Sequence, residues 1–302
     1  MISLLAVLLS AFQPAAPQPA GIPSSYVPQR VFDTHRQAFT DFEAMLADAV
    51  KADVLFVGEE HDDANTHRLE LAVLEGLTRR HRSLVLGMEM FERDVQPAVD
   101  AYLSGGSTEA AFLAAARPWP RYATDYRASL EFAREHQIPV VASNVPRRIA
   151  SEVSKRGLEA LESLGAERRL AATDLQCPTA GDYYDRFLDA MTDHGAAKDA
   201  APSADTRAKT DRYYLAQCVK DETMGEAIAG AVGQATDRQR TVVHYNGSFH
   251  SDFGEGTAQK AARRLSGRRI VVVTIIPVDD LDVVRPDGDD LKRADYLVYS
   301  VK

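Results

Sequence analysis

The sequence predicts an α/β protein with a mostly parallel central sheet and helices on both faces of that sheet. Short apolar segments rich in β-branched residues recur along the chain, and longer segments with helical spacing separate them. The apolar segments do not alternate with polar residues, which is typical of parallel strands that are covered on both sides. Fewer than eight such units occur, which argues against a closed barrel.

The predicted strands and helices follow one another as βαβ units require. The strand segments are residues 53–58, 83–89, 138–143, 241–246, 270–276 and a last segment, ADYLVYS, at 294–300. Helical spacing covers residues 64–81, 94–104, 108–116, 123–137 and 146–164.

The segment 166–240 interrupts this order, because it contains no convincing strand. It predicts helices at 167–173, 181–193 and 206–233 around a loop of small residues at 195–205. We interpret it as a helical insertion before the late strands that forms a cap or lid. Residues 21–302 are then expected to form a single α/β domain.

The N-terminal segment is typical of an exported protein. Residues 2–12, ISLLAVLLSAF, are uncharged and apolar, but a membrane-spanning helix needs about 20 such residues. The segment fits the apolar core of a signal peptide at residues 1–20, with small residues for cleavage near Ala16 and Ala20. We expect a periplasmic or secreted protein, with an uncleaved or interfacial anchor as the alternative. No cysteine lies near the cleavage region, so we do not expect a lipoprotein.

Composition excludes some classes of function. The net charge of −9 argues against a nucleic-acid partner, because such proteins need a basic face to displace counterions from phosphates. Cys177 and Cys218 are the only cysteines. In an exported protein they could form a disulfide bond, and buried free thiols are an equally good interpretation.

Ionisable and amide side chains follow four of the predicted strands. Ligands of open α/β sheets bind outside the carboxyl ends of the strands, and all these ends lie on one rim. The residues are Glu59, Glu60 and His61 after the first strand, Glu89 after the second, Asn144 and Arg147 after the third, and His250 after the fourth. We therefore predict a site at this rim.

The first strand end, LFVGEEHDD at 55–63, contains five ionisable groups with different expected roles. Side chains alternate along a strand, so Glu59 and His61 point to the same side and Glu60 to the other. Asp62 or Asp63 is expected to cap the following helix. His67 lies about 240° round that helix from His61 and cannot chelate with it as an i,i+4 pair would. We interpret His244, within a strand, as a packed core residue.

Two chemistries fit the rim residues. Glu59, His61, Glu89 and His250 could coordinate a divalent metal, or they could act as general base and acid around a water molecule. Asn144 and Arg147 would orient a substrate. Glu89 lies between two methionines, so we expect it to face a polar cavity or a cation. The sequence contains no GxSxG, P-loop or GxGxxG pattern after any strand, which argues against the usual esterase, NTPase and dinucleotide-binding classes.

Taken together and in this order, several motifs resemble the ChaN-like haem-binding uptake family of the superfamily that includes Tiki proteases and erythromycin esterases. The motifs are VGEEHDD at 57–63, GMEMFERDVQPAVDAYL at 87–103, Trp119, FAREHQIPVVASNVPR at 132–147, YYLAQCVKDETMG at 213–225 and NGSFHSDFGEG at 246–256. The resemblance maps the conserved Glu and His positions of the superfamily onto Glu59, His61, Glu89 and His250.

This resemblance implies haem as the ligand and a role in iron uptake at the cell envelope. A transport partner in the envelope and a homodimer are compatible with that role. Haem iron needs an axial ligand, for which the insertion supplies four candidates, Tyr183, Tyr184, Tyr213 and Tyr214. Two hypotheses follow from the sequence: a haem-binding protein, or a metal-dependent hydrolase that uses the Glu and His residues of the rim.

Overall fold

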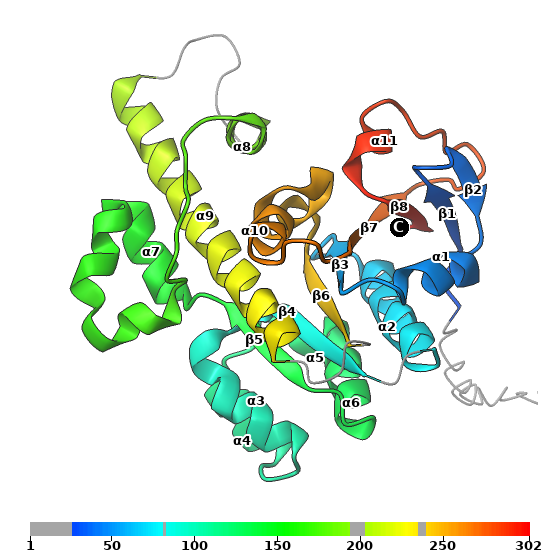
Figure 1. The fold of residues 1–302 in the computed structure, drawn as a ribbon, viewed down its shortest axis with the longest axis horizontal. Coiled ribbons are helices and arrows are strands. Elements are labelled where there is room, and N and C mark those ends of the chain that lie inside the picture. Colours follow the sequence, from blue (N-terminus) through cyan, green and yellow to red (C-terminus); the bar gives the residue numbers. More distant parts are fainter. Residues whose placement is uncertain (1–25, 81–82, 194–202, 235–239) are drawn as a thin grey trace, which may run out of the picture.

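The computed structural model describes residues 26–80, 83–193, 203–234 and 240–302. Its strands are β1 (Gln29–Asp33), β2 (Ala38–Thr40), β3 (Val54–Glu59), β4 (Leu84–Glu92), β5 (Val140–Asn144), β6 (Thr241–Gly247), β7 (Ile270–Val278) and β8 (Tyr296–Val301). They form one sheet in the order β2-β1-β8-β7-β3-β6-β4-β5 (Figure 1). The strands from β8 to β5 are parallel, and β1 is antiparallel to both its neighbours. The predicted fold class is confirmed.

The six parallel strands correspond to the six predicted segments. The hairpin of β1 and β2 was missed, because its strands are short, lie at the edge and contain no continuous apolar segment. The central strand β3 is buried along its whole length, which explains its uninterrupted apolar sequence before Glu59.

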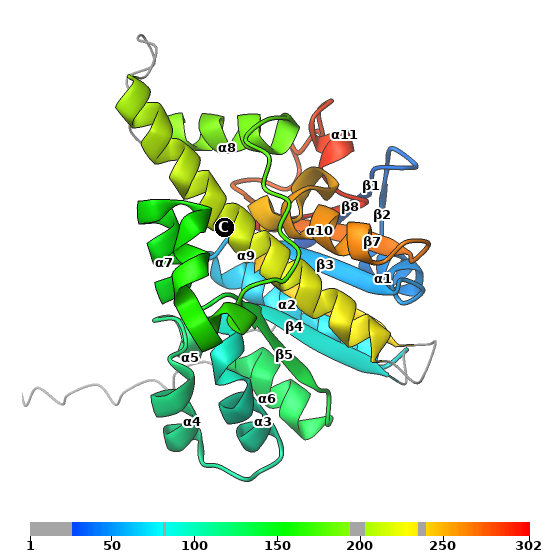
Figure 2. The ribbon, with the colours of Figure 1, turned by 60° about the vertical axis from the view of Figure 1, so that its left-hand side comes forward.

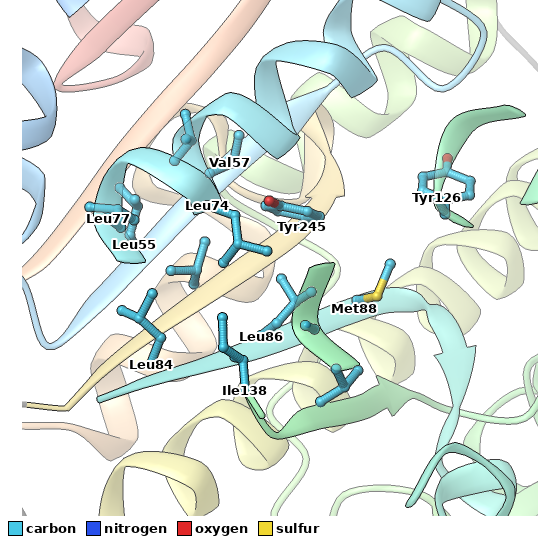
Figure 3. Packing of buried hydrophobic residues seen from close by; sticks show 14 of the residues in the cluster. Leu55, Val57, Leu74, Leu77, Leu84, Leu86, Met88, Tyr126, Ile138 and Tyr245 are labelled. Carbon is cyan, nitrogen blue, oxygen red and sulfur yellow. The ribbon is translucent and has the colours of Figure 1, made fainter. Parts of the chain in front are cut away.

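One face of the sheet is covered by the helices that follow β2, β3 and β4. These are α1 (Phe42–Ala49), α2 (Ala64–Thr78), α3 (Gln96–Leu103), α4 (Glu109–Ala116), α5 (Tyr122–Asp125) and α6 (Arg127–Glu135). Their apolar side chains share one core cluster with β3, β4, β5 and β6. Figure 3 shows Leu55 and Val57 of β3 near Leu74 and Leu77 of α2. Asp63 caps α2, because its side chain accepts a hydrogen bond from the backbone N–H of Thr66.

The other face is covered by α9 (Ala204–Gly233) and α10 (Gly256–Arg264), whose residues Ile228, Val232 and Ala261 pack against β3, β6 and β7. Figure 2 shows α9 crossing the sheet, with α8 (Asp182–Asp193) beside its N-terminal end. The predicted insertion is therefore more than a lid. The second half of α9 belongs to the core of the sheet, since its apolar residues recur at helical spacing.

The helix predicted at 146–164 is shorter than expected. Helix α7 (Arg147–Arg156) ends at Gly157, whose positive φ of 77° stops the helix. The 3₁₀ segment η2 (Leu158–Leu170) follows and packs with α7 and α9. The helix predicted at 167–173 is wrong, since η2 ends at Leu170 and irregular structure follows.

The predicted leader at 1–20 lies entirely outside the described residues, and so does most of the predicted loop at 195–205. Within the described ranges, no helix is both long enough and apolar enough to cross a bilayer.

Helices α9 and α10 approach each other closely at Gly225. A Cβ atom at this position would lie 2.9 Å from the backbone nitrogen of Ala261 and 2.9 Å from the carbonyl carbon of Lys260. Backbone atoms cannot move aside as the end of a side chain can. A glycine at 225 is therefore required for α10 to pack this close to α9.

We expect Gly225→Ala to lower the free energy of unfolding by about 1–3 kcal/mol, because the added methyl group forces the two helices apart. The matched control is Gly230→Ala on the same helix, where a Cβ atom meets nothing within 4 Å. That change should raise the stability by up to about 1 kcal/mol, since alanine is the better helix former. Urea denaturation of both variants measures the difference, and equal effects would contradict the tight packing.

Candidate functional site

The carboxyl ends of β3, β4 and β6 meet at a cavity of about 790 Å³. Six of the seven predicted rim residues line it: Glu59, Glu60, His61, Glu89, Arg147 and His250. The seventh, Asn144, is not among the lining residues and donates a hydrogen bond from its side-chain amide to the backbone carbonyl of Glu89, 3.1 Å away. The convergence arises because parallel strands end on the same side of the sheet.

Glu59 and His61 form a hydrogen-bonded pair, as their alternation along the strand predicted. His61 donates from Nδ1 to Oε1 of Glu59, and the hydroxyl of Tyr126 donates to the same oxygen at 2.8 Å. Burial opposes ionisation of Glu59, but its hydrogen bond with His61 and its close approach to His67 outweigh burial and lower its pKa to about 2. Burial opposes charge on His61 as well, and the Glu59 carboxylate nonetheless raises its pKa.

The ring of His61 lies between the strand ends and an aromatic wall. Trp119 packs edge-on against it, with ring centroids 5.0 Å apart. On the other side, a Cβ atom at Gly247 would lie 2.7 Å from Nε2 of His61, so only glycine leaves room for the ring. The side chain of His61 is 46% exposed, whereas that of Glu59 is fully buried. This is a histidine oriented by a carboxylate and open to the cavity, an arrangement suited to proton transfer.

His250 is held differently, between two carboxylates. Its Nδ1 donates to Asp221 at 2.6 Å, and its Nε2 lies 3.2 Å from Oε1 of Glu89. The other oxygen of Glu89 accepts a hydrogen bond from the backbone N–H of Gly247 at 2.8 Å. Burial alone would lower the pKa of His250, but the charges of Glu89 and Asp221 outweigh it and raise the pKa to about 10. His250 is therefore a fixed cation between two anions.

Asp221 was not identified from the sequence. It is fully buried on α9, where it also accepts hydrogen bonds from the hydroxyls of Thr257, at 2.9 Å, and Tyr183, at 2.7 Å. The helical periodicity of the sequence does indicate that Asp221 is buried. Asp221 falls on the same stripe as the buried residues Cys218, Gly225 and Ile228, at steps of three and four residues.

His67 was also not assigned to the site. Its Nδ1 lies 3.0 Å from Glu70 and 3.4 Å from Oε2 of Glu59, so it is buried behind a residue that lines the cavity. His244 is a fully buried residue that hydrogen-bonds Ser143 and Asn246, as expected for a core histidine.

The four predicted metal ligands all line the cavity. However, no three of Glu59, His61, Glu89 and His250 place one ligand atom each within 4.8 Å of one another in the described ranges. A metal site made of these four residues stays a prediction.

The four tyrosines proposed as haem ligands have different surroundings, and none is among the residues that line the cavity. The hydroxyl of Tyr183 donates to Asp221 and that of Tyr184 to Asp211. Tyr214 is buried against Tyr184 and Phe187. Tyr213 is 36% exposed and lies one and two turns before Gln217 and Lys220, two cavity residues on the same face of α9.

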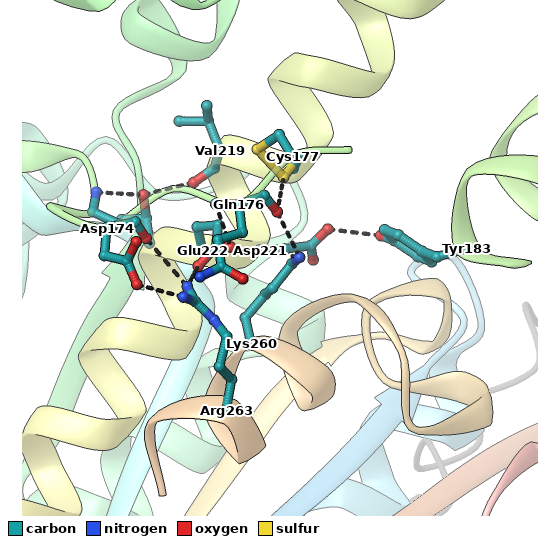
Figure 4. The surroundings of a disulfide bond; sticks show 12 residues. Asp174, Gln176, Cys177, Tyr183, Val219, Asp221, Glu222, Lys260 and Arg263 are labelled. Atoms are coloured by element: carbon teal, nitrogen blue, oxygen red, sulfur yellow. Dashed lines mark hydrogen bonds and ion pairs between the residues drawn. A yellow bond between two sulfur atoms is a disulfide. The ribbon is translucent and has the colours of Figure 1, made fainter. Parts of the chain in front are cut away.

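Cys177 and Cys218 form a disulfide bond, which settles the alternative that the sequence left open. It ties the segment that leads into α8 to the middle of α9 (Figure 4). The same figure shows Asp221, one turn beyond Cys218, bonded to Tyr183 of α8. Phe187 and Met191 of α8 line the cavity, so the disulfide bond fixes the chain segment that carries this wall.

A parallel sheet whose carboxyl edge carries paired glutamate and histidine side chains defines the class of the protein, an α/β protein with a rim site. Residues 45–260 match the family described as "Haem-binding uptake, Tiki superfamily, ChaN", and the chain belongs to this family. The resemblance identified from the sequence is confirmed. No curated protein sequence matches the chain.

Several solved structures are similar to the chain in fold. ChaN of Campylobacter jejuni, described with cofacially bound haem, is 16% identical over 91% of this chain and 97% of its own, with a TM-score of 0.66. The type III effector HopBA1 is 12% identical over 93% and 99% of the two chains, with a TM-score of 0.48. The erythromycin esterase EreC is 15% identical over 91% and 83%, with a TM-score of 0.45. The last two scores are too low to group the chain with either protein.

We expect the free energy of unfolding to fall as the pH rises from about 6.5 to about 10, because folded His250 holds its proton up to about pH 10 and unfolded histidine loses it near 6.5. The stabilisation is complete below pH 6.5 and is lost as the pH passes through the folded pKa. His250→Gln should flatten this decline, as measured by urea denaturation across the range. The matched control, His136→Gln at an exposed histidine, should leave it unchanged. Equal slopes for the His250 variant and the unsubstituted protein would refute the charged state.

Proposed function

We propose that the cavity binds haem and that the protein takes part in haem or iron uptake at the cell envelope. The observation that carries the proposal is the composition of the cavity wall. The volume of the cavity, about 790 Å³, lies within the range of small-molecule and cofactor sites. The apolar part of the wall includes Trp119, Phe187, Met191 and Phe249, which provide flat and polarisable surfaces for a porphyrin ring.

The charged part of the wall suits the haem propionates. Arg147 and Lys220 line the cavity, and neither side chain forms an ion pair with any other described residue. Arg148, the neighbour of Arg147, is by contrast paired with Asp94 and Glu167. Two unpaired cations beside an apolar cleft complement a ligand with an apolar ring and two carboxylates.

Tyr213 is the best candidate for the iron ligand among the four tyrosines. A phenolate must form and reach the iron. Burial and Asp221 raise the pKa of Tyr183, burial and Asp211 raise that of Tyr184, and burial raises that of Tyr214 to about 12. Tyr213 is the exposed member of the group, on the face of α9 that lines the cavity. The family description and the haem-bound ChaN of Campylobacter jejuni support haem as the ligand.

Two features support an envelope location. Residues 2–12 fit a signal peptide, and the Cys177–Cys218 disulfide bond is typical of an oxidising compartment.

Hydrolysis is the second candidate function. It is favoured by the Glu59–His61 pair, in which a buried carboxylate orients a histidine that is open to the cavity. In this version the imidazole of His61 takes a proton from a water molecule, and Arg147 binds an anionic group of the substrate.

We expect haem to bind the unsubstituted protein and to give a Soret band. Tyr213→Phe should shift that band and weaken the affinity more than about tenfold, because the iron loses its ligand. The matched control is Tyr184→Phe, whose hydroxyl is bound to Asp211, and it should behave like the unsubstituted protein. Arg147→Gln and Lys220→Gln should each weaken binding only about two- to fivefold, as expected for exposed ion pairs.

Absorption titration tests these outcomes. The absence of a Soret band in the unsubstituted protein would exclude haem binding. An unchanged spectrum in Tyr213→Phe would exclude Tyr213 as the iron ligand and would leave haem binding itself unaffected.

We expect fractionated cells to contain the protein outside the cytoplasm, without its first 20 or so residues and with no free thiol. Intact-mass measurement and thiol alkylation test both points. A control chain that starts after residue 20 should stay in the cytoplasm with both thiols reactive, since reducing compartments keep cysteines reduced. A full-length cytoplasmic product would refute export.

A further inference from the structure

A second group of ionisable side chains lies under the cavity floor and is not explained by haem binding. His67 and Glu70, three residues apart on α2, face the end of β3 together. Nδ1 of His67 lies 3.0 Å from Oε2 of Glu70 and 3.4 Å from Oε2 of Glu59. The three residues are 4%, 0% and 1% exposed. One ligand atom from each can be chosen so that all three lie within 4.8 Å of one another.

Two carboxylate oxygens of this group accept no hydrogen bond, although one of them lies 3.4 Å from His67. Oε2 of Glu59 and Oε1 of Glu70 are buried and accept no hydrogen bond from any described residue. A buried carboxylate oxygen without a hydrogen bond is costly. The Glu59 oxygen points at the group itself, as its 3.4 Å distance from His67 shows. These lone pairs are available to a ligand that carries positive charge.

The spacing of the donor atoms fits a small metal ion. Donors that bind zinc with bonds of about 2.0 Å in a tetrahedron lie about 3.3 Å apart. The distances of 3.0 and 3.4 Å are close to this value. On binding, a dication would replace the proton of His67 and balance the charge of the two carboxylates.

The surroundings orient the three side chains as the outer partners of a metal site do. Histidine ligands commonly donate their second ring nitrogen to a carbonyl or a carboxylate. Nε2 of His67 lies 3.3 Å from the backbone carbonyl of His61 and 3.6 Å from Asp125. The second oxygen of Glu59 is held by Tyr126 and His61. The ring and the carboxylate are thus fixed from behind.

We propose that Glu59, His67 and Glu70 bind one divalent first-row transition metal ion. Two carboxylates and one imidazole are donors that manganese, iron and zinc accept. The site lies beneath the haem cavity and shares only Glu59 with its wall. Through Glu59 the ion fixes the orientation of His61, so the metal has a positioning role for the cavity.

The test uses haem-free protein equilibrated with zinc, manganese or cobalt chloride and then dialysed. We expect about one bound ion per chain by elemental analysis, and a rise in the melting temperature that a chelator reverses. The cobalt-loaded protein should show d–d absorption bands typical of nitrogen and oxygen donors without sulfur.

Two conservative variants identify the ligands. Glu70→Gln and His67→Gln keep the size of the side chain, and each should weaken metal binding more than about 100-fold, since even outer partners are worth 10- to 100-fold. Glu70→Gln distinguishes a metal ligand from a carboxyl group that only shares a proton. If Glu70 only shares a proton with its neighbours, glutamine imitates the neutral acid, and both metal binding and stability stay unchanged.

Two control variants keep this proposal separate from haem binding. Tyr213→Phe should bind metal as the unsubstituted protein does, so a failure of haem binding leaves the metal result intact. His250→Gln should also bind metal, and loss of the ion in this variant would place it at the rim and overturn the proposal. Less than about 0.1 ion per chain in the unsubstituted protein would overturn the proposal. Unchanged affinity in Glu70→Gln and His67→Gln would place any bound ion elsewhere and overturn it too. If both variants unfold, the stoichiometry and the cobalt spectrum of the unsubstituted protein decide.

Discussion

The architecture of the site depends on one buried carboxylate at the end of the central strand. Glu59 has a fully buried side chain, so its charge must be compensated by neighbours from other elements. His61 comes from the loop after β3, His67 from α2 and Tyr126 from the turn before α6. These contacts fix where α2 and α6 sit relative to the strand end. The position of the His61 ring at the cavity therefore depends on its contact with Glu59.

On the opposite side of the cavity, the long helix α9 carries a second buried carboxylate that neighbouring residues must compensate. Asp221, buried in the middle of α9, carries a charge that His250, Thr257 and Tyr183 compensate. The interaction joins α9 to the loop after β6 and to α8. One helix thus packs its second half on the sheet and supplies part of the cavity wall with its first half.

Local patterns predicted much of this molecule. Continuous apolar segments identified all six parallel strands. Because parallel strands end at one edge of the sheet, the sequence also predicted that Glu59, Glu89 and His250 lie at one rim. The edge hairpin was missed because its strands carry too few apolar residues to show a period. Asp221 was missed because a carboxylate inside a long helix reads as solvent-exposed unless its place on the apolar stripe is counted.

The sequence by itself determined which residues reach the carboxyl edge, because alternation along a strand and the direction of parallel strands are local properties of the chain. Tertiary structure decided what those residues contact. His250 is a fixed cation because Asp221, far away in the sequence, packs against it, whereas His61 keeps one side open. The exposure of Tyr213 next to buried Tyr214 was decided in the same way. Burial and partner distances depend on how helices pack over the sheet, and no local pattern contains that information.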